Sequence, residues 1–372
     1  MLTECNPHAR LETFPPILQR PLPSPYASLI HAWERRLNRV DQDRRITAFD
    51  WGSEWLRATP LNHVGAWPAQ APAHGVIADL RAWNERVLTA SGEFFSYPPV
   101  RAFRREGDWL RFDSPVATPY AENREVHARW FPAPGPKAVV VVAQWNADEH
   151  GHWGLCSLLQ RAGIAALRVS MPYHDRRMPA GLRRAEYTVD ANIGRTIHAA
   201  RQAVGDIRAA LDWLEQEGYT SLGIVGTSLG SCYALLASAH EPRLRVNAFN
   251  HVSQYFGDVV WTGLATRHVR DSLAGYVDQE QLREAWRVIS PASYLDTYAR
   301  LARETGKRSL LIWARYDPCF LPEFSRAVVA SFRRLGLPFE AHGLPCGHYT
   351  IGRWPFKYVD AGLIVRFLRR EL

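Results

Sequence analysis

The sequence predicts an α/β fold, with a mostly parallel central sheet and helices on both of its faces. Three observations support this prediction. From residue 108 onward, apolar runs of strand length alternate with segments of helical periodicity. The run 138–143 is continuously apolar and rich in valine, which is typical of a strand buried on both faces. One predicted strand also leads into a glycine-flanked serine, and a predicted helix follows it.

Residues 1–100 are predicted to form a helical N-terminal extension and not an independent domain, because no second hydrophobic core is apparent in them. Prolines favour an extended arm at its start, since proline fixes φ and lacks a backbone N–H; they stand at positions 7, 15, 16, 21, 23 and 25. Apolar side chains at helical spacing then predict an amphipathic helix over 26–40, packed on the core. These side chains are Leu29, Ile30, Trp33, Leu37 and Val40. Tryptophan-rich segments predict further helices over 49–56 and 76–88.

Residues 101–372 are predicted to form the core. Strands are expected over 109–112, 126–131, 138–143, 164–169, 221–225, 244–249, 309–314 and 338–341. Helices are expected over 153–162, 193–217, 229–240, 324–335 and 355–370. The first two strands are predicted to enter the sheet as an antiparallel pair, and the strand–helix alternation after them implies parallel neighbours.

Residues from about 250 to 306 interrupt this alternation, because they contain no clear strand. Their mixed helical pattern predicts a helical lid inserted over the edge of the sheet. The segment is rich in aromatic side chains, namely Tyr255, Phe256, Trp261, Tyr276, Trp286, Tyr294 and Tyr298. Either these aromatic groups offer an apolar surface to a substrate, or they form the core of the lid itself.

The composition of the 372-residue chain, 47% hydrophobic and 22% charged, is that of a globular protein and not of a disordered one. Its formal charge of +8 comes almost wholly from arginines that are scattered among acidic residues. This pattern indicates a solvated surface and no stripe for nucleic acid. The sequence shows no signal peptide and no apolar run of about 20 residues, so we expect no stable membrane insertion. Five cysteines are too few for a disulfide scaffold, which favours a cytoplasmic location.

The segment Gly226-Thr227-Ser228-Leu229-Gly230 is the main candidate for chemistry. On a strand-to-helix turn, this pattern forces the serine into a strained conformation that projects its hydroxyl from the sheet. Glycines two residues before and two residues after the serine avoid collisions with neighbouring backbone. Ser228 is therefore the predicted nucleophile.

A serine hydroxyl is a weak nucleophile near neutral pH, so it requires a base and an orienting acid. Asp317 follows the predicted strand 309–314, and His348 lies in a glycine-containing turn before the last helix. Asp258 is the reserve candidate for the acid. His342, His251 and His240 fit the position of the base less well.

The order Ser228, Asp317, His348 resembles the α/β-hydrolase superfamily, and the resemblance covers residues 108–372. It implies the α/β-hydrolase fold, with Ser228 as nucleophile, His348 as general base and then acid, and Asp317 fixing the imidazole tautomer. It also implies an oxyanion hole from the backbone N–H of Leu229 and a second N–H in the loop 144–151. Alignment on the end of strand 138–143 favours the N–H of Trp145, with Gln144 and Asn146 as the alternatives.

The loops 144–151 and 171–177 resemble a branch of this superfamily that includes eukaryotic abhydrolase-domain proteins. Both are predicted to lie at the carboxyl edge of the sheet, where ligands collect in open α/β folds. The predicted substrate-binding residues are Gln144, Asn146, Tyr173, His174, Arg176 and Tyr255. A surface pair of Asp175 and Arg176 is the alternative interpretation of the second loop.

No metal and no cofactor are expected. His150, His152, Asp148 and Glu149 are dense in ligand types, but no second cluster with ligand spacing completes a zinc site. Cys319 and Cys346 each lie two residues from a predicted catalytic residue. Free thiols are expected there, and a disulfide between the two loops is the alternative.

The predicted function is hydrolysis of a small-molecule carboxylic ester or thioester through an acyl-enzyme. A serine at this turn argues against dehalogenase and epoxide-hydrolase chemistry, which use aspartate there. Acyl transfer and amide or peptide hydrolysis on the same residues remain alternatives, because one fold hosts many reactions. A non-catalytic binding protein on a hydrolase scaffold is the alternative from another class. The oligomeric state is left open between a monomer and a homo-oligomer.

Overall fold

The computed structural model describes residues 24–39, 44–57 and 75–372. The predicted proline-rich arm therefore lies outside the described residues except for its last proline, as does Val40 of the predicted first helix. In the described ranges, none of the helices combines the length and the apolar character that crossing a bilayer requires.

Nine strands form one sheet in the order β1-β2-β3-β5-β4-β6-β7-β8-β9. Their bounds are β1 Arg104–Glu106, β2 Trp109–Asp113, β3 Glu125–Phe131, β4 Lys137–Val142, β5 Ala165–Val169, β6 Ser221–Thr227, β7 Leu244–Asn250, β8 Arg308–Ala314 and β9 Phe339–Leu344. Strands β1, β2, β3 and β5 pair antiparallel in that order, and every pairing from β5 to β9 is parallel. The mostly parallel sheet and its antiparallel entry are thus confirmed.

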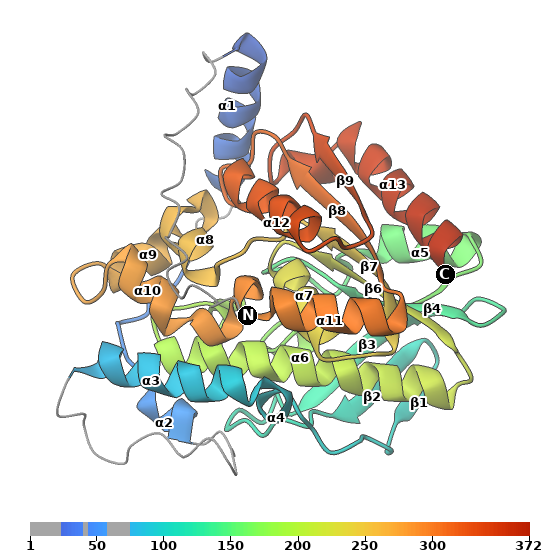
Figure 1. Ribbon diagram of the computed structural model, residues 1–372, viewed down its shortest axis with the longest axis horizontal. Helices are drawn as coiled ribbons and strands as arrows, with labels where there is room; N and C mark the ends of the chain where they lie inside the picture. The colour runs from blue at the N-terminus through green and yellow to red at the C-terminus, as the bar shows by residue number, and fades with distance from the viewer. Residues whose placement is uncertain (1–23, 40–43, 58–74) are drawn as a thin grey trace, which may run out of the picture.

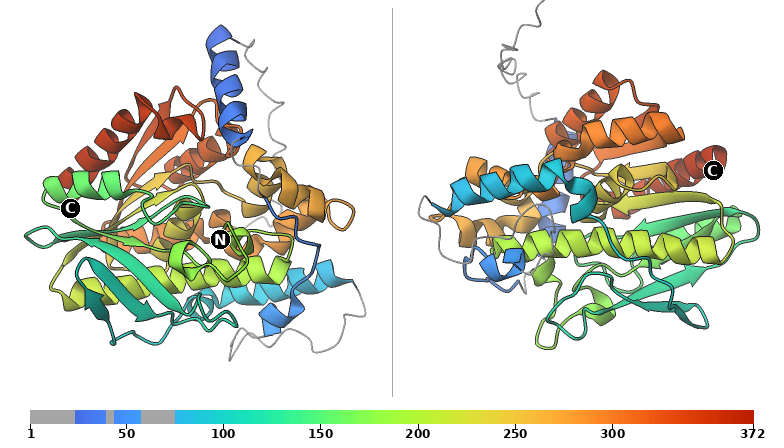
Figure 2. Two further views of the ribbon diagram at one scale, coloured as in Figure 1. Left: turned by 180° about the vertical axis from the view of Figure 1, so that it is seen from behind. Right: turned by 60° about the horizontal axis from the view of Figure 1, so that its bottom comes forward.

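Helices cover both faces of this sheet (Figures 1 and 2). In the described ranges their bounds are α1 Pro25–Arg39, α2 Ser53–Arg57, α3 Val76–Thr89, α4 Ser91–Phe94, α5 Trp153–Arg161, α6 Ile193–Gln216, α7 Leu229–Ala239, α8 Phe256–Thr262, α9 Arg267–Leu273, α10 Gln279–Ala285, α11 Leu295–Thr305, α12 Pro322–Arg334 and α13 Phe356–Glu371. Residues of α6, α7, α11 and α12 share the core of one face, and residues of α5 and α13 share that of the other. In β4, all residues from Ala138 to Val142 are buried, as the apolar run 138–143 predicted.

The segment between β7 and β8 folds into helices α8 to α11, so the predicted helical insertion is present. Three of its seven aromatic side chains form a core, since Trp286, Tyr294 and Tyr298 are at most 1% exposed and belong to the larger hydrophobic cluster. The second interpretation of these aromatic groups, as buried core, therefore describes these three. Tyr276 is an exception, because it is exposed.

Two features differ from the predicted elements. The short strand β1 and the one-turn helix α4 were not predicted, because neither has an apolar pattern long enough to stand out. Helix α1 is present, yet Leu29 on it is 62% exposed whereas Ile30 and Glu34 are buried. The helix therefore packs through a face that is rotated away from part of its apolar pattern.

Candidate active site

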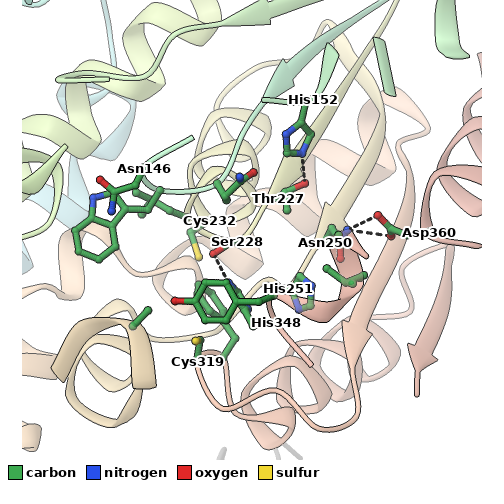
Figure 3. A pocket seen from close by; sticks show the side chains of 18 of the residues that line it. Asn146, His152, Thr227, Ser228, Cys232, Asn250, His251, Cys319, His348 and Asp360 are labelled. Atoms are coloured by element: carbon green, nitrogen blue, oxygen red, sulfur yellow. Dashed lines mark hydrogen bonds between the residues drawn. The ribbon is translucent and has the colours of Figure 1, made fainter. Parts of the chain in front are cut away.

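Ser228 stands on the turn between β6 and α7, at the carboxyl edge of the sheet (Figure 3). Its φ of 56° and ψ of −122° form a conformation that L-residues rarely adopt and that costs on the order of 1–3 kcal/mol. The Ser228 N–H donates to the carbonyl of Asn250 on β7 (2.8 Å), and the Ser228 carbonyl accepts from the Ser231 N–H (2.9 Å). These bonds fix the turn, so the strained serine is held in place by backbone on both sides.

The two glycines of the turn are required by close approach. A Cβ on Gly226 would lie 2.7 Å from the Cβ of Ala234 and even closer to the Gly230 carbonyl oxygen. A Cβ on Gly230 would lie 2.5 Å from the carbonyl oxygen of Val142, which ends β4, and closer still to that of Ala143. Both glycines therefore let α7 begin directly against the central strands.

His348 and Asp317 complete a chain of hydrogen bonds that begins at Ser228. Ser228 Oγ lies 3.0 Å from His348 Nε2, and His348 Nδ1 lies 2.8 Å from Asp317 Oδ2. Asp317 follows β8 and His348 follows β9, two strands that bring both loops to the same edge of the sheet as the serine. With Nδ1 facing a carboxylate, the imidazole carries its proton there, and Nε2 is free to accept from the serine hydroxyl.

Electrostatics reinforce this arrangement. Burial by itself raises the pKa of Asp317, but the charge of His348 and hydrogen bonds to the carboxylate outweigh it and hold that pKa well below its usual range. The backbone N–H groups of Cys319 and Phe320 donate to Asp317 Oδ1 over 2.7 and 2.8 Å. Burial lowers the pKa of His348, but the negative charges of Asp317 and Glu34 overcome it and raise that pKa above its ordinary value.

A second histidine, His251, lies beside the same carboxylate. His251 Nδ1 is 3.0 Å from Asp317 Oδ2 without hydrogen-bond geometry, and its ring centroid lies 4.8 Å from that of His348. In the described part of the chain, His251, Asp317 and His348 form the cluster of ligand-type atoms close enough to hold a metal ion. The oxygens of Asp317 are already engaged by His348 and two backbone N–H groups, so a bound ion would have to break these contacts.

The loop 144–151 is fixed by hydrogen bonds that include one from the backbone N–H of Asn146. The Asn146 N–H donates to His174 Nε2 (3.0 Å), while His174 Nδ1 lies 2.9 Å from the Pro172 carbonyl. Burial lowers the pKa of His174 to about 4, so this imidazole is neutral and accepts at Nε2. The Trp145 side chain is fixed separately, since its Nε1 donates to the Ala185 carbonyl (2.8 Å).

A cavity of about 820 Å³ opens onto Ser228. The predicted binding residues Gln144 and Asn146 line it, as do the predicted oxyanion donors Trp145 and Leu229. One side is apolar and includes Phe256, Val259 and Val260 of the insertion. The side near α5 and α13 adds polar groups to apolar ones: His152 Nε2 lies 2.9 Å from Thr227 Oγ1 and Asn250 Nδ2 donates to Asp360 (Figure 3), while Leu155 and Leu158 of α5 also line it.

Four residues predicted to bind substrate do not line this cavity. Tyr173 and His174 are at most 1% exposed. Tyr173 packs against Tyr120 and Tyr187, and His174 accepts the hydrogen bond from the Asn146 N–H of the 144–151 loop. Arg176 lies on the surface with Glu149, and the ring of Tyr255 lies under Arg283. Their places after strands were predicted correctly, but side-chain direction within a loop has no signal in the sequence.

Asp258, the reserve candidate for the acid, lies away from His348. Both of its oxygens accept from Arg283, so its carboxylate is held within the insertion. The carboxylate hydrogen-bonded to His348 is that of Asp317.

The charged residues of the loops 144–151 and 171–177 do not converge on one point. The surface partner of Arg176 is Glu149, since Asp175 is buried against Arg168. The histidines also separate, because His152 contacts Thr227 whereas His150 lies near Glu149. The expected surface pair of Asp175 and Arg176 is thus replaced by a pair between the two loops.

The cysteines Cys156, Cys232, Cys319 and Cys346 are free and buried. No disulfide therefore joins the loops of Asp317 and His348. Cys319 and Cys232 line the cavity instead. Cys5 lies outside the described residues.

Several residues at the site were not predicted. Glu34 of α1 contacts the loop of His348, and Arg44 brings a second part of the N-terminal extension to the cavity. Asn250 and Asp360 line the cavity and are hydrogen-bonded to each other. Of these residues, Asn250 had a usable signal, because it ends a strand at the edge where Ser228 stands.

Comparisons with known proteins agree with this architecture. The family model for alpha/beta hydrolase domain containing 18 matches residues 153–289, a segment that includes Ser228 and ends before Asp317. Among curated proteins, none matches the chain.

Solved structures resemble the chain at low sequence identity. An acylaminoacyl peptidase from Pyrococcus horikoshii is 16% identical with a TM-score of 0.55, over 73% of this chain and 42% of the peptidase. An acetyl xylan esterase from Paenibacillus sp. R4 is 15% identical with a TM-score of 0.54, over 82% of this chain and 97% of the esterase. Acetyl xylan esterase 1 from Thermoanaerobacterium sp. JW/SL YS485 is 16% identical with a TM-score of 0.53, over 78% and 93%.

The chain thus spans less than half the length of the peptidase and nearly all of the two esterases. At these identities the likeness concerns the fold. The sheet order, the strained serine turn and the insertion after β7 agree with it. This chain has the α/β-hydrolase fold that the order of Ser228, Asp317 and His348 implied.

Proposed function

We propose that this chain is a serine hydrolase that cleaves a small-molecule carboxylic ester or thioester through an acyl-enzyme. The observation that carries the proposal is the continuous path of hydrogen bonds from Ser228 Oγ through His348 to Asp317. A hydroxyl, a base and an orienting acid in this geometry are the parts that nucleophilic acyl transfer requires.

In the proposed reaction, Ser228 Oγ attacks the carbonyl carbon while His348 Nε2 takes the hydroxyl proton. Asp317 stabilises the imidazolium, whose proton then passes to the leaving alcohol or thiol. Water repeats the sequence on the acyl-enzyme, with His348 as base, and releases the carboxylic acid. The histidine returns to its neutral state after each half-reaction, so the cycle requires no cofactor.

The oxyanion would accept hydrogen bonds from the backbone N–H groups of Leu229 and Trp145. Leu229 begins α7, where N–H groups have no carbonyl partner within the helix. Asn146, the neighbouring alternative, donates its N–H to His174. This commitment favours Trp145 as the second donor, and each donor is worth about 3 kcal/mol in the transition state.

The apolar side of the cavity supports a substrate with an apolar acyl or alcohol group. Leu229, Phe256, Val259 and Val260 line that side within a volume of about 820 Å³, which accommodates a drug-sized molecule. A series of p-nitrophenyl esters and thioesters of increasing acyl length is expected to show kcat/KM rising with chain length and then falling. A matched series of p-nitroanilides distinguishes ester cleavage from amidase activity.

The free thiols Cys156, Cys232, Cys319 and Cys346 support a reducing compartment, so we include a cytoplasmic location in the proposal. Microscopy of the full chain with a fluorescent tag tests it. Staining confined to an oxidising compartment would contradict this part.

Labelling with a fluorophosphonate probe tests the proposal directly. The wild-type chain is expected to be labelled and Ser228→Ala is not, while Ser157→Ala on α5, outside the cavity lining, serves as the matched control. Absence of labelling and of ester turnover in a folded wild-type chain would favour a binding protein on this scaffold. Esterase activity that survives in Ser228→Ala would assign the nucleophile elsewhere.

A further inference from the structure

The N-terminal helix α1 lies against the loop that carries His348, although the two are more than 300 residues apart in the sequence. Figure 1 and the left view of Figure 2 show α1 beside the C-terminal elements. Three of its side chains bond to residues 345–350. The Tyr26 hydroxyl donates to the Pro345 carbonyl, and Asn38 Oδ1 accepts from the Tyr349 hydroxyl over 3.0 Å.

Glu34 makes the central contact of this set. Its Oε2 accepts from the Tyr349 N–H over 2.9 Å, and its Oε1 accepts from the Thr350 N–H over 2.8 Å. The carboxylate therefore binds the two backbone N–H groups that directly follow His348. Because His348 must reach both Ser228 and Asp317, the position of these two peptide units decides whether the imidazole is aligned.

The loop is shaped around this carboxylate. A Cβ on Gly347 would lie 2.5 Å from Glu34 Cγ and Oε1, so a larger residue next to His348 would expel the glutamate. The Gly347 N–H is held separately by Thr350 Oγ1 over 2.7 Å. The turn before the last helix is thus closed by bonds on both sides of His348, and Glu34 supplies those on one side.

Packing alone does not explain why the Glu34 carboxylate is buried. It is 0% exposed, and burying a carboxylate costs several kcal/mol unless it is compensated. Burial raises the pKa of Glu34, whereas the two backbone N–H groups and the charge of His348 act against that rise. In the other direction, the Glu34 charge acts together with Asp317 to raise the pKa of His348.

We propose that Glu34 is a positioning residue of the active site: its carboxylate aligns the His348 loop and stabilises the imidazolium that forms when Ser228 is deprotonated. The proposal rests on the proposed function and gives the N-terminal helix a part in it. Asp317 holds the imidazole itself, whereas Glu34 holds the peptide units after it and contacts no substrate. Part of the catalytic apparatus therefore comes from outside the sheet and its insertion.

Glu34→Gln tests this role in the full-length chain. The amide keeps the shape but has one acceptor oxygen, and its NH₂ group faces a backbone N–H that it cannot satisfy. We expect kcat to fall by up to about a hundredfold with KM nearly unchanged, because misplacing a catalytic group costs about that much. Arg35→Gln, an exposed charge change on the same helix, is the matched control and is expected to retain wild-type kcat.

A purely structural role is separated by the titration of His348, followed by NMR of histidines labelled at Cε1, with His348→Gln identifying the signal. This readout does not require turnover, so it remains decisive if the chain hydrolyses no tested ester. The midpoint of His348 is expected to move to lower pH in Glu34→Gln and to stay in Arg35→Gln. Rates are divided by the fraction of folded protein, measured by circular dichroism.

An unmoved His348 midpoint in Glu34→Gln would overturn the proposal, even if the variant were less stable. A wild-type kcat per folded molecule would overturn it as well. Failure of the proposed function has a different signature, in which wild type itself is neither labelled by fluorophosphonate nor active. If Glu34→Gln does not fold, Glu34→Asp takes its place, because the shorter side chain draws the carboxylate away from the Tyr349 and Thr350 N–H groups, and the same two outcomes then decide.

Discussion

Gly230→Ala is the most informative small change, because it adds one methyl group between the serine turn and the central strand. The added Cβ would lie 2.5 Å from the Val142 carbonyl oxygen and closer still to that of Ala143. Ordinary van der Waals contact begins near 3.4 Å. Helix α7 and the end of β4 would therefore have to separate by about 1 Å (3.4 − 2.5 = 0.9 Å), and both are backbone.

The expected cost follows from two opposing effects. Alanine is favoured over glycine inside a helix by about 1 kcal/mol, whereas overpacking a close-packed site costs about 1–3 kcal/mol. Because the partner here is strand backbone, we take the upper value and expect a net loss of about 2 kcal/mol in unfolding free energy. The same displacement moves the loop of Trp145 relative to Ser228, so turnover is expected to fall by up to about a hundredfold.

Gly362→Ala in α13 is the matched control, since no atom lies within 4 Å of its added Cβ and the position is exposed. It is expected to raise the unfolding free energy by up to about 1 kcal/mol. Urea denaturation followed by tryptophan fluorescence measures both variants, and the rate of fluorophosphonate labelling measures the turn. A Gly230→Ala protein as stable as Gly362→Ala, and labelled at the wild-type rate, would refute the close approach on which this reasoning rests.

Further outcomes follow from charged groups at the site and in the core. The pKa of His348 is raised and only the neutral imidazole accepts a proton, so kcat/KM is expected to rise with pH with a midpoint above 6.5. Asp317→Asn is expected to lower kcat about 10⁴-fold in a p-nitrophenyl ester assay. Arg177→Met leaves Asp206 buried without its ion pair, so urea denaturation is expected to show a loss of about 3–5 kcal/mol, and a loss below about 1 kcal/mol would contradict this role. Burial raises the pKa of Asp360 to about 7, so the folded state binds more protons than the unfolded state and the unfolding free energy falls as pH rises from about 4 to about 7. Asp360→Asn removes this part of the decline, and an unaltered pH dependence of unfolding would show that Asp360 titrates normally.

The central sheet and the serine turn could be predicted from the sequence because their signals are local. Strand β4 is buried on both faces and therefore apolar at every position from Ala138 to Val142. Gly226 and Gly230 carry their own steric reason within a five-residue segment. Asp317 and His348 could be found because parallel strands end at one edge, so residues after β8 and β9 are brought near Ser228.

Predictions that depended on side-chain direction were less successful. Tyr173 and His174 follow a strand at the correct edge, yet they turn into the core and away from the cavity. A loop residue has no periodicity, so sequence alone does not indicate which way it points. The Asn146 N–H is already bonded to His174, and only the position of His174 in space shows this.

The fold and the three residues Ser228, Asp317 and His348 could be predicted from local patterns, because strand–helix alternation and a glycine-bounded turn act over short segments of chain. Which distant groups surround these residues depends on how the whole chain packs. Glu34 shows the difference, since a buried carboxylate on a helix that exposes Leu29 contradicts the amphipathic pattern of that helix. Its partners, Tyr349 and Thr350, become its neighbours only when the chain folds, and no local rule couples residues that far apart.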